Sequence, residues 1–142
     1  QPVTARGECT TEELENINNR MYTLLGNKGA YLDDLYYCPH HPDSGFDGEI
    51  KELKFDCNCR KPKTGMIQQA VKDHNIDVEN SWIIGDTTID IQTGINAGLN
   101  TALVLTGEAG NDRKYQVKAD VRAENLEQCV EVIIEKGKHY ER

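Results

Sequence analysis

The sequence predicts an α/β fold in which parallel strands alternate with helices. Two apolar runs indicate the strands: residues 81–86, which end in Gly-Asp, and residues 101–105. A stretch with helical character, 88–97, lies between them and has the length of a crossover helix. An amphipathic helix at 124–136 is expected to close the chain. The second half of the sequence therefore predicts a parallel sheet with helical crossovers.

The first half predicts one clear helix. Thr10 and Glu13 stand three residues apart, as the N-cap and N3 residues of a capping box do. Apolar residues then recur at helical spacing, at Leu14, Ile17, Met21, Leu24 and Leu25. Glycines at 26 and 29 are expected to end this helix.

The residues between this helix and the sheet predict a long loop. Residues 32–37 form a short apolar run typical of a strand, and 64–75 predict a second helix. Between them, residues 39–55 are polar, contain two glycines and lack helical periodicity. Long loops without secondary structure need a stabilising reason, and a bound metal is one.

Length and charge limit the possible functions. A chain of 142 residues is expected to form one domain, spanning 1–142, with one core. The net charge of −8 argues against nucleic-acid binding, which requires an excess of lysine and arginine. No apolar run approaches the ~20 residues of a membrane span. Reduced thiols and no targeting signal predict a cytoplasmic protein.

Four residues have the spacing of a zinc site. Cys38 and His40 form one close pair, and Cys57 and Cys59 form the other. Zn²⁺ prefers four tetrahedral thiolate and imidazole ligands, and a closed set of four leaves no position for water. The sequence therefore predicts a structural zinc ion that holds a zinc loop, residues 38–61.

The alternative is a disulfide with a surface histidine. Five cysteines, an odd number, and the lack of an apolar signal stretch disfavour a secreted disulfide framework. His41 is a second candidate for the fourth ligand. Cys9 and Cys129 have no partner at ligand spacing, so ordinary semi-buried side chains are expected there.

Two cations follow the last cysteine directly. Arg60 and Lys61 precede Pro62, and this adjacency to the predicted metal site points to anion binding. The alternative is a solvated pair of basic residues, which is usual for two adjacent cations.

Two aspartates mark the end of the first predicted strand. In open parallel sheets, ligands bind beyond the carboxyl ends of the strands, and Asp86 lies at such an end. Asp90 falls in the first turn of the next helix, where a carboxylate is favoured by the helix dipole. Such a pair is a common way to hold Mg²⁺, although capping the turn is an equally simple role.

Three stretches resemble the D-glycero-D-manno-heptose 1,7-bisphosphate 7-phosphatases of the haloacid dehalogenase superfamily. They read YYCPHHP at 36–42, CNCRKPKTGM at 57–66 and IGDTTID at 84–90. The resemblance runs from residue 1 to about Gly107. The zinc loop is shared with histidinol-phosphate phosphatases, whereas the residues around it are more similar to the heptose enzymes.

The resemblance implies a fold, an activity and residue roles. It implies a Rossmann-like three-layer core and a Mg²⁺-dependent phosphatase of heptose biosynthesis for lipopolysaccharide, working through an aspartyl-phosphate. Lys61 would neutralise the transferring phosphoryl group, Asp86 would ligate Mg²⁺, and Asp90 would support the magnesium site. Arg60 would contact the other phosphate of the sugar. These roles agree with the chemistry of phosphoryl transfer.

The sequence departs from the family at its nucleophile. The Asp-x-Asp-x-Thr motif expected on the first strand does not occur, because no Asp-x-Asp is present in the 142 residues. We therefore expect the N-terminal strands of the family to be missing and little or no turnover by these residues alone. Self-association through the exposed sheet edge is also expected.

Two other functions stay open from the sequence. One is a histidinol-phosphate phosphatase, which shares the zinc loop. The other is an inactive module that binds a sugar phosphate or a protein through the zinc loop and Arg60.

Overall fold

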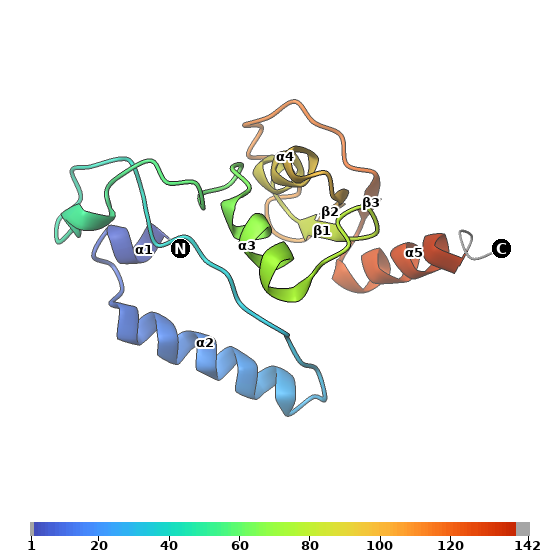
Figure 1. Cartoon of the computed structure of the whole chain (residues 1–142), viewed down its shortest axis with the longest axis horizontal. Coiled ribbons are helices and arrows are strands. Elements are labelled where there is room, and N and C mark those ends of the chain that lie inside the picture. The colour runs from blue at the N-terminus through green and yellow to red at the C-terminus, as the bar shows by residue number, and fades with distance from the viewer. Residues whose placement is uncertain (1, 139–142) are drawn as a thin grey trace. The chain divides into compact units, whose positions relative to one another are not determined.

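The computed structural model describes residues 2–138 and divides into two compact units, Gln1–Arg60 and Lys61–Arg142 (Figure 1). Each unit has its own internal contacts. The expectation of one domain over 1–142 stays a prediction.

The second unit contains a parallel three-stranded sheet. Its strands are β1 (Trp82–Gly85), β2 (Asn100–Val104) and β3 (Val121–Ala123), in the order β1-β2-β3. Ile84 lies opposite Ala102, and Ala102 lies opposite Val121. The α/β class with a parallel sheet, predicted from the alternation of apolar runs and helices, is confirmed.

Three helices accompany the sheet: α3 (Gly65–His74), α4 (Thr88–Ala97) and α5 (Leu126–Lys138). Helix α4 begins at the predicted residue because Thr87 accepts a hydrogen bond from the Asp90 amide, and the Asp90 carboxylate accepts one from the Thr87 amide. Helix α3 ends at His74, and its C-cap residue Asn75 adopts the left-handed conformation (φ 50°).

Helices α4 and α5 pack on the sheet through different sets of strand residues. Alternate strand residues point to opposite faces. One set, Ala102, Val104, Val121 and Ala123, forms a core with Cys129 of α5. On the other set, Gly94 of α4 lies so close to Ile83 and Thr101 that a Cβ at Gly94 would overlap both side chains. The unit is therefore a three-layer α/β/α arrangement, as the Rossmann-like prediction requires.

The first unit is dominated by one helix and a long irregular segment. Its helices are α1 (Pro2–Ala5), α2 (Thr11–Gly26) and the single 3₁₀ turn η1 (Lys51–Leu53). The predicted capping box of α2 is present, since the Glu13 amide donates to Thr10 Oγ1 at 3.1 Å and the Thr10 amide donates to the Glu13 carboxylate at 2.8 Å. The long loop predicted for 39–55 is confirmed apart from η1.

Two strand assignments differ from the sequence prediction. Residues 32–37 are not a strand: they form no ladder in the part of the chain that the structure describes, and Tyr37 and Leu32 are exposed. Apolar composition alone misled the prediction, because a strand needs a hydrogen-bonded partner. Strand β3 was missed because it is only three residues long.

Helix α5 begins two residues later than predicted. Asn125 caps it, since Asn125 Oδ1 accepts a hydrogen bond from the Gln128 amide at 3.0 Å. No helix among the described residues is long and apolar enough to cross a membrane.

Candidate functional site

The first unit brings the four predicted zinc ligands together. The ligand atoms of Cys38, His40, Cys57 and Cys59 all lie within 4.8 Å of one another. Cys38 Sγ is 3.3 Å from Cys57 Sγ, and His40 Nδ1 is 3.3 Å from Cys59 Sγ. A tetrahedral zinc ion with bonds of about 2.3 Å to sulfur needs ligand atoms slightly under 4 Å apart. The cluster fits that requirement.

The sulfur atoms of the cluster form no disulfide bond. Cys57 Sγ and Cys59 Sγ are 3.1 Å apart, far beyond the length of a disulfide bond, and both residues are unbridged. Burial raises the pKa of Cys38, and it raises the pKa of Cys59 to about 12. Burial acts the same way on Cys57, but hydrogen bonds from the neighbouring thiols outweigh it and lower the pKa of Cys57. Two of the three sulfurs thus favour the neutral form, and a dication would stabilise them as thiolates.

The remaining cysteines and His41 lie elsewhere. His41 is buried but outside the cluster: its Nδ1 accepts a hydrogen bond from the Asp43 amide at 3.2 Å, and its Nε2 is 3.4 Å from Arg6 Nη2. Burial lowers the pKa of His41, and the charges of Arg60 and Arg6 lower it further. Cys129 is fully buried in the core of the second unit, and Cys9 is half-buried.

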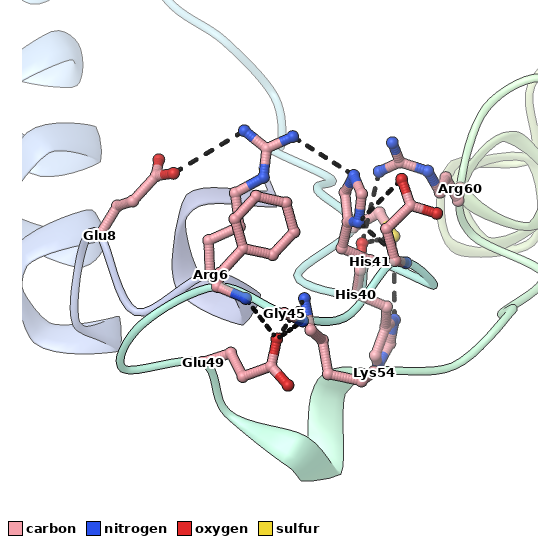
Figure 2. A network of polar contacts seen from close by, with 11 residues as sticks. Arg6, Glu8, His40, His41, Gly45, Glu49, Lys54 and Arg60 are labelled. Carbon is pink, nitrogen blue, oxygen red and sulfur yellow. Dashed lines mark hydrogen bonds and ion pairs between the residues drawn. The ribbon is translucent and has the colours of Figure 1, made fainter.

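A second set of contacts holds the zinc loop (Figure 2). Arg6 and Lys54 each place a cation over the Phe46 ring, at 5.0 and 4.6 Å from its centre. Glu49 accepts hydrogen bonds from the amides of Gly45 and Phe46 and pairs with Lys54 at 3.4 Å. The bond from the Phe46 amide is the main reason why the pKa of Glu49 is lowered. The loop is therefore fixed by aromatic and ionic contacts in addition to the thiol cluster.

Arg60 is the last residue of the first unit. Its Nη1 donates to the carbonyl of His40 at 3.4 Å, so the guanidinium is tied to the backbone of a ligand residue. The alternative of a freely solvated Arg60 is thereby disfavoured.

The second unit places Asp86 and Asp90 at the carboxyl end of β1. Gly85 is the last strand residue, and a Cβ there would overlap the Asp90 side chain. Asp90 therefore packs directly against Gly85, the strand residue that precedes Asp86. A glycine before the first aspartate is required by this close approach.

Asp90 also fixes Lys61. Lys61 Nζ lies 2.5 Å from Asp90 Oδ1, while the amide and hydroxyl of Thr87 donate to Asp90 Oδ2. The Asp90 side chain is 9% exposed and that of Lys61 is 45% exposed, so the lysine side chain is partly exposed while its partner is buried. Asn96 of α4 donates to the carbonyl of Pro62 at 2.9 Å and holds the segment that carries Lys61. Support of a magnesium site by Asp90 stays a prediction.

Asp86 is held differently. Its Oδ2 accepts a hydrogen bond from the Glu108 amide at 2.8 Å, and its carbonyl accepts one from the Gly110 amide at 2.8 Å. Within the described residues, Oδ1 accepts no hydrogen bond. One carboxylate oxygen is thus open to a cation, and Mg²⁺ is commonly bound by one or two carboxylates together with waters and a phosphate. Asp86 fits that role.

Sequence reasoning missed the residues that hold these groups. Arg6, Phe46 and Lys54 come from three separate stretches, and Glu108 reaches Asp86 across 22 residues. No spacing rule connects positions this far apart. Only the Gly-Asp step at 85–86 gave a local signal.

The family model described as HAD-hydrolase-like matches residues 58–129. This range is half of the chain, and it contains Lys61, Asp86, Asp90 and the whole parallel sheet. The chain belongs to the HAD-hydrolase-like family.

Within that family, the curated proteins that the chain resembles include heptose-bisphosphate phosphatases. The D-glycero-beta-D-manno-heptose-1,7-bisphosphate 7-phosphatase of Yersinia pestis is 40% identical over 105 residues, which cover 73% of this chain and 54% of that protein. The phosphatase of the same name from Escherichia coli K12 is 37% identical over 105 residues, covering 73% and 53%. The resemblance inferred from the motifs is confirmed.

A solved structure gives the same result. The D,D-heptose 1,7-bisphosphate phosphatase from B. bronchiseptica, in complex with magnesium and phosphate, superposes with a TM-score of 0.79 at 28% identity. The superposition covers 96% of this chain and 71% of that one. The chain spans about half the length of the curated relatives that it matches.

Proposed function

We propose that this chain forms part of a Mg²⁺-dependent phosphatase that hydrolyses the 7-phosphate of D-glycero-D-manno-heptose 1,7-bisphosphate in the cytoplasm. The observation that carries the proposal is the arrangement at the end of β1, where Lys61 pairs with buried Asp90 and Asp90 packs against Gly85, the residue before Asp86. The names of the relatives supply the substrate.

Lys61 and Asp86 have complementary tasks. Lys61 is fixed by Asp90 yet exposed enough to meet a phosphoryl oxygen, and its charge would stabilise the negative charge of the transferring group. Asp86 offers the open Oδ1 to Mg²⁺, and the bound ion would neutralise charge on the phosphoryl oxygens. The neighbouring structure with magnesium and phosphate supports both roles.

Arg60 and the zinc loop would select the substrate. The four ligand residues would hold zinc in a closed site, so the metal orders the loop and takes no part in the reaction. Arg60 is tied to this loop through the His40 carbonyl and would contact the second phosphate of the sugar. A substrate with only one phosphate should gain little binding affinity from Arg60.

The covalent nucleophile is the group that these residues do not supply. No Asp-x-Asp occurs in the sequence, Asp90 is engaged with Lys61 and Thr87, and Asp86 cannot both ligate Mg²⁺ and attack phosphorus. We therefore propose that the 142 residues alone bind Mg²⁺ and phosphate weakly and release no phosphate above background. An Asp-x-Asp-x-Thr strand would have to complete the site.

A chimera tests this function. The matching part of the Yersinia pestis relative is replaced by these residues, and phosphate release from heptose 1,7-bisphosphate is compared with release from histidinol phosphate. Mg²⁺-dependent release with preference for the heptose is expected. Lys61→Ala and Asp86→Ala should each lower kcat by about 100-fold or more. Lys72→Ala, an exposed lysine of α3, is the matched control and should change little.

Arg60→Ala separates substrate selection from catalysis. It should raise KM for the bisphosphate and leave turnover of a heptose monophosphate nearly unchanged. Equal losses on both substrates would contradict the specificity role.

The remaining outcomes decide between the alternatives. Preference of the chimera for histidinol phosphate would reassign the substrate. A folded chimera that binds Mg²⁺ and phosphate without turnover would favour the inactive binding module, which the absence of Asp-x-Asp also motivates. Turnover by the isolated chain would overturn the assignment of the missing nucleophile.

A further inference from the structure

The segment that follows β2 is bound to the residues that follow β1. Two amides of this segment reach Asp86: Glu108 donates to its Oδ2 and Gly110 donates to its carbonyl, each at 2.8 Å. We refer to residues 107–115 as the 107–115 loop. These two contacts hold both the side chain and the backbone of Asp86.

Gly107 leaves the room that this contact needs. Its φ is 75°, and a Cβ added there would overlap the Asp86 carboxylate. Gly110 has nearly the same φ, 78°, but a Cβ at Gly110 would come no closer than 3.3 Å, to Leu103 Cδ2. The two glycines therefore share a backbone conformation, and only Gly107 is pressed against the carboxylate.

The far end of the loop is anchored to the start of α4. Asp112 accepts hydrogen bonds from the amide and hydroxyl of Thr88, at 2.7 and 2.6 Å. The Thr88 hydroxyl in turn accepts from the amides of Lys114 and Tyr115, both at 3.1 Å. The Asp112 carboxylate thus occupies the N-terminus of α4, where negative charge is favoured.

The ionisation state of Asp112 favours its hydrogen bonds with Thr88. Burial raises the pKa of Asp112, but the hydrogen bonds from Thr88 outweigh it, so its pKa lies below the ordinary value. Asp112 is therefore a carboxylate at neutral pH, able to accept both bonds.

We propose that the 107–115 loop is a positioning element for the Asp86 carboxylate, with Gly107 as its contact point and the Asp112–Thr88 pair as its anchor. The loop holds Asp86 Oδ2 and leaves Oδ1 for the cation. A carboxylate fixed in advance loses less side-chain freedom when it binds an ion, so its affinity is higher. The inference rests on the proposed role of Asp86 as a magnesium ligand.

The first test compares Gly107→Ala with Gly110→Ala in the 142-residue chain. Both place alanine at a positive φ, so both carry a similar backbone penalty. NMR follows the exchange rate of the Glu108 amide, the rotamer of Asp86 and the shift of both residues on titration with Mg²⁺. In Gly107→Ala we expect faster exchange at Glu108, averaging of the Asp86 rotamer and about tenfold weaker Mg²⁺ binding, the loss that corresponds to one freed side chain. Gly110→Ala should stay within about twofold of the unmodified chain.

The second test addresses the anchor without a glycine. Thr88→Val removes the hydroxyl that joins Asp112 to Lys114 and Tyr115, whereas Thr88→Ser keeps it. Thr88→Val should reproduce the Gly107→Ala effects at Glu108 and Asp86. Thr88→Ser should leave the Glu108 exchange rate and the Asp86 rotamer as they are in the unmodified chain. This pair decides the matter if Gly107→Ala does not fold.

The outcomes separate this inference from the proposed function. Equal effects in both glycine variants, or unchanged Mg²⁺ binding in Gly107→Ala, would overturn the positioning role. Failure of the unmodified chain to bind Mg²⁺ would overturn the magnesium role of Asp86. In that case Glu108 exchange and the Asp86 rotamer still decide: a change confined to Gly107→Ala and Thr88→Val supports the loop, and no change overturns it.

Discussion

The two units of the chain differ in the interactions that stabilise each of them internally. Among the described residues of Lys61–Arg142, the buried apolar side chains come from adjacent strands and from α4 and α5, and hydrogen-bonded ladders join the strands. Among the described residues of Gln1–Arg60, the buried apolar side chains are Ala5, Leu14 and two thiols of the cluster, Cys38 and Cys57. The first unit thus has a very small apolar core.

This difference shows how a long loop can be specified. Apolar burial and regular hydrogen bonding stabilise the sheet unit, as in most domains. The loop unit relies on a metal-binding cluster and on charged groups around Phe46. Its order should therefore depend on zinc and on single side chains, whereas the order of the sheet should not.

The largest expected effect is that of Cys57→Ser. Loss of one thiolate from a closed four-ligand site should abolish tight zinc binding, because hydroxyl oxygen is a poor ligand for this ion. We expect one zinc per unmodified chain, about none in the variant, a disordered 38–60 segment and unchanged strand content. Elemental analysis measures the zinc content, amide hydrogen exchange measures the order of 38–60, and circular dichroism measures the strand content. Cys9→Ser is the matched control. Global unfolding of Cys57→Ser would contradict the independence of the sheet.

Asp90→Ala should be the most destabilising change at the site in the sheet unit. It removes the capping box of α4 and leaves Lys61 without its buried partner, a combined loss of about 2–3 kcal/mol in the free energy of unfolding. Asp90→Asn keeps an oxygen for the Thr87 amide and should lose about half as much. Denaturant unfolding gives both values. Equal stability of the two variants would show that the cap contributes nothing.

Phe46→Leu tests the charged contacts of the loop. It keeps an apolar side chain but removes the ring that Arg6 and Lys54 approach, at a cost of about 1 kcal/mol. Faster amide exchange at Phe46 and Gly45 is expected, with no change at β2. Phe46→Tyr keeps the ring and should behave like the unmodified chain. If Leu and Tyr are equally well tolerated, the cation contacts do not stabilise the loop.

The smallest effect concerns pH. Hydrogen bonds from the hydroxyl and amide of Thr101 hold the pKa of Asp120 below its ordinary value, which tethers the start of β3 to β2. A depressed folded pKa gives stability that is present above the unfolded pKa of about 3.9 and is lost as pH falls through the folded value. Asp120→Asn should reduce the loss of unfolding free energy at acidic pH by less than about 1 kcal/mol, because the Asp120 side chain is largely solvated. An unchanged curve would contradict the tether.

The sequence predicted the parts of the fold that depend on local patterns. Helix α4 was predicted with both ends correct, because Thr87 and Asp90 form its cap and Gly98 follows its last residue. The four cluster residues were predicted from spacing, since ligand type and separation are themselves local features. The apolar run at 32–37 was misread because composition does not reveal whether a partner strand exists.

The contacts that hold the site could not be predicted. Gly107 and Glu108 have no unusual neighbours in sequence, and their importance comes from the return of the chain to Asp86 after β2. The approach of Arg6 to Phe46 and His41 depends on how the loop turns. Such contacts require the tertiary structure.

Region-resolved amide exchange before and after removal of zinc by a chelator tests the difference between the units most directly. We expect protection to fall across residues 38–60 and to stay unchanged at β1 and β2, with recovery when zinc is restored. Unchanged protection at 38–60, or equal loss at the strands, would contradict the claim that metal binding orders the loop while the sheet is stable without it.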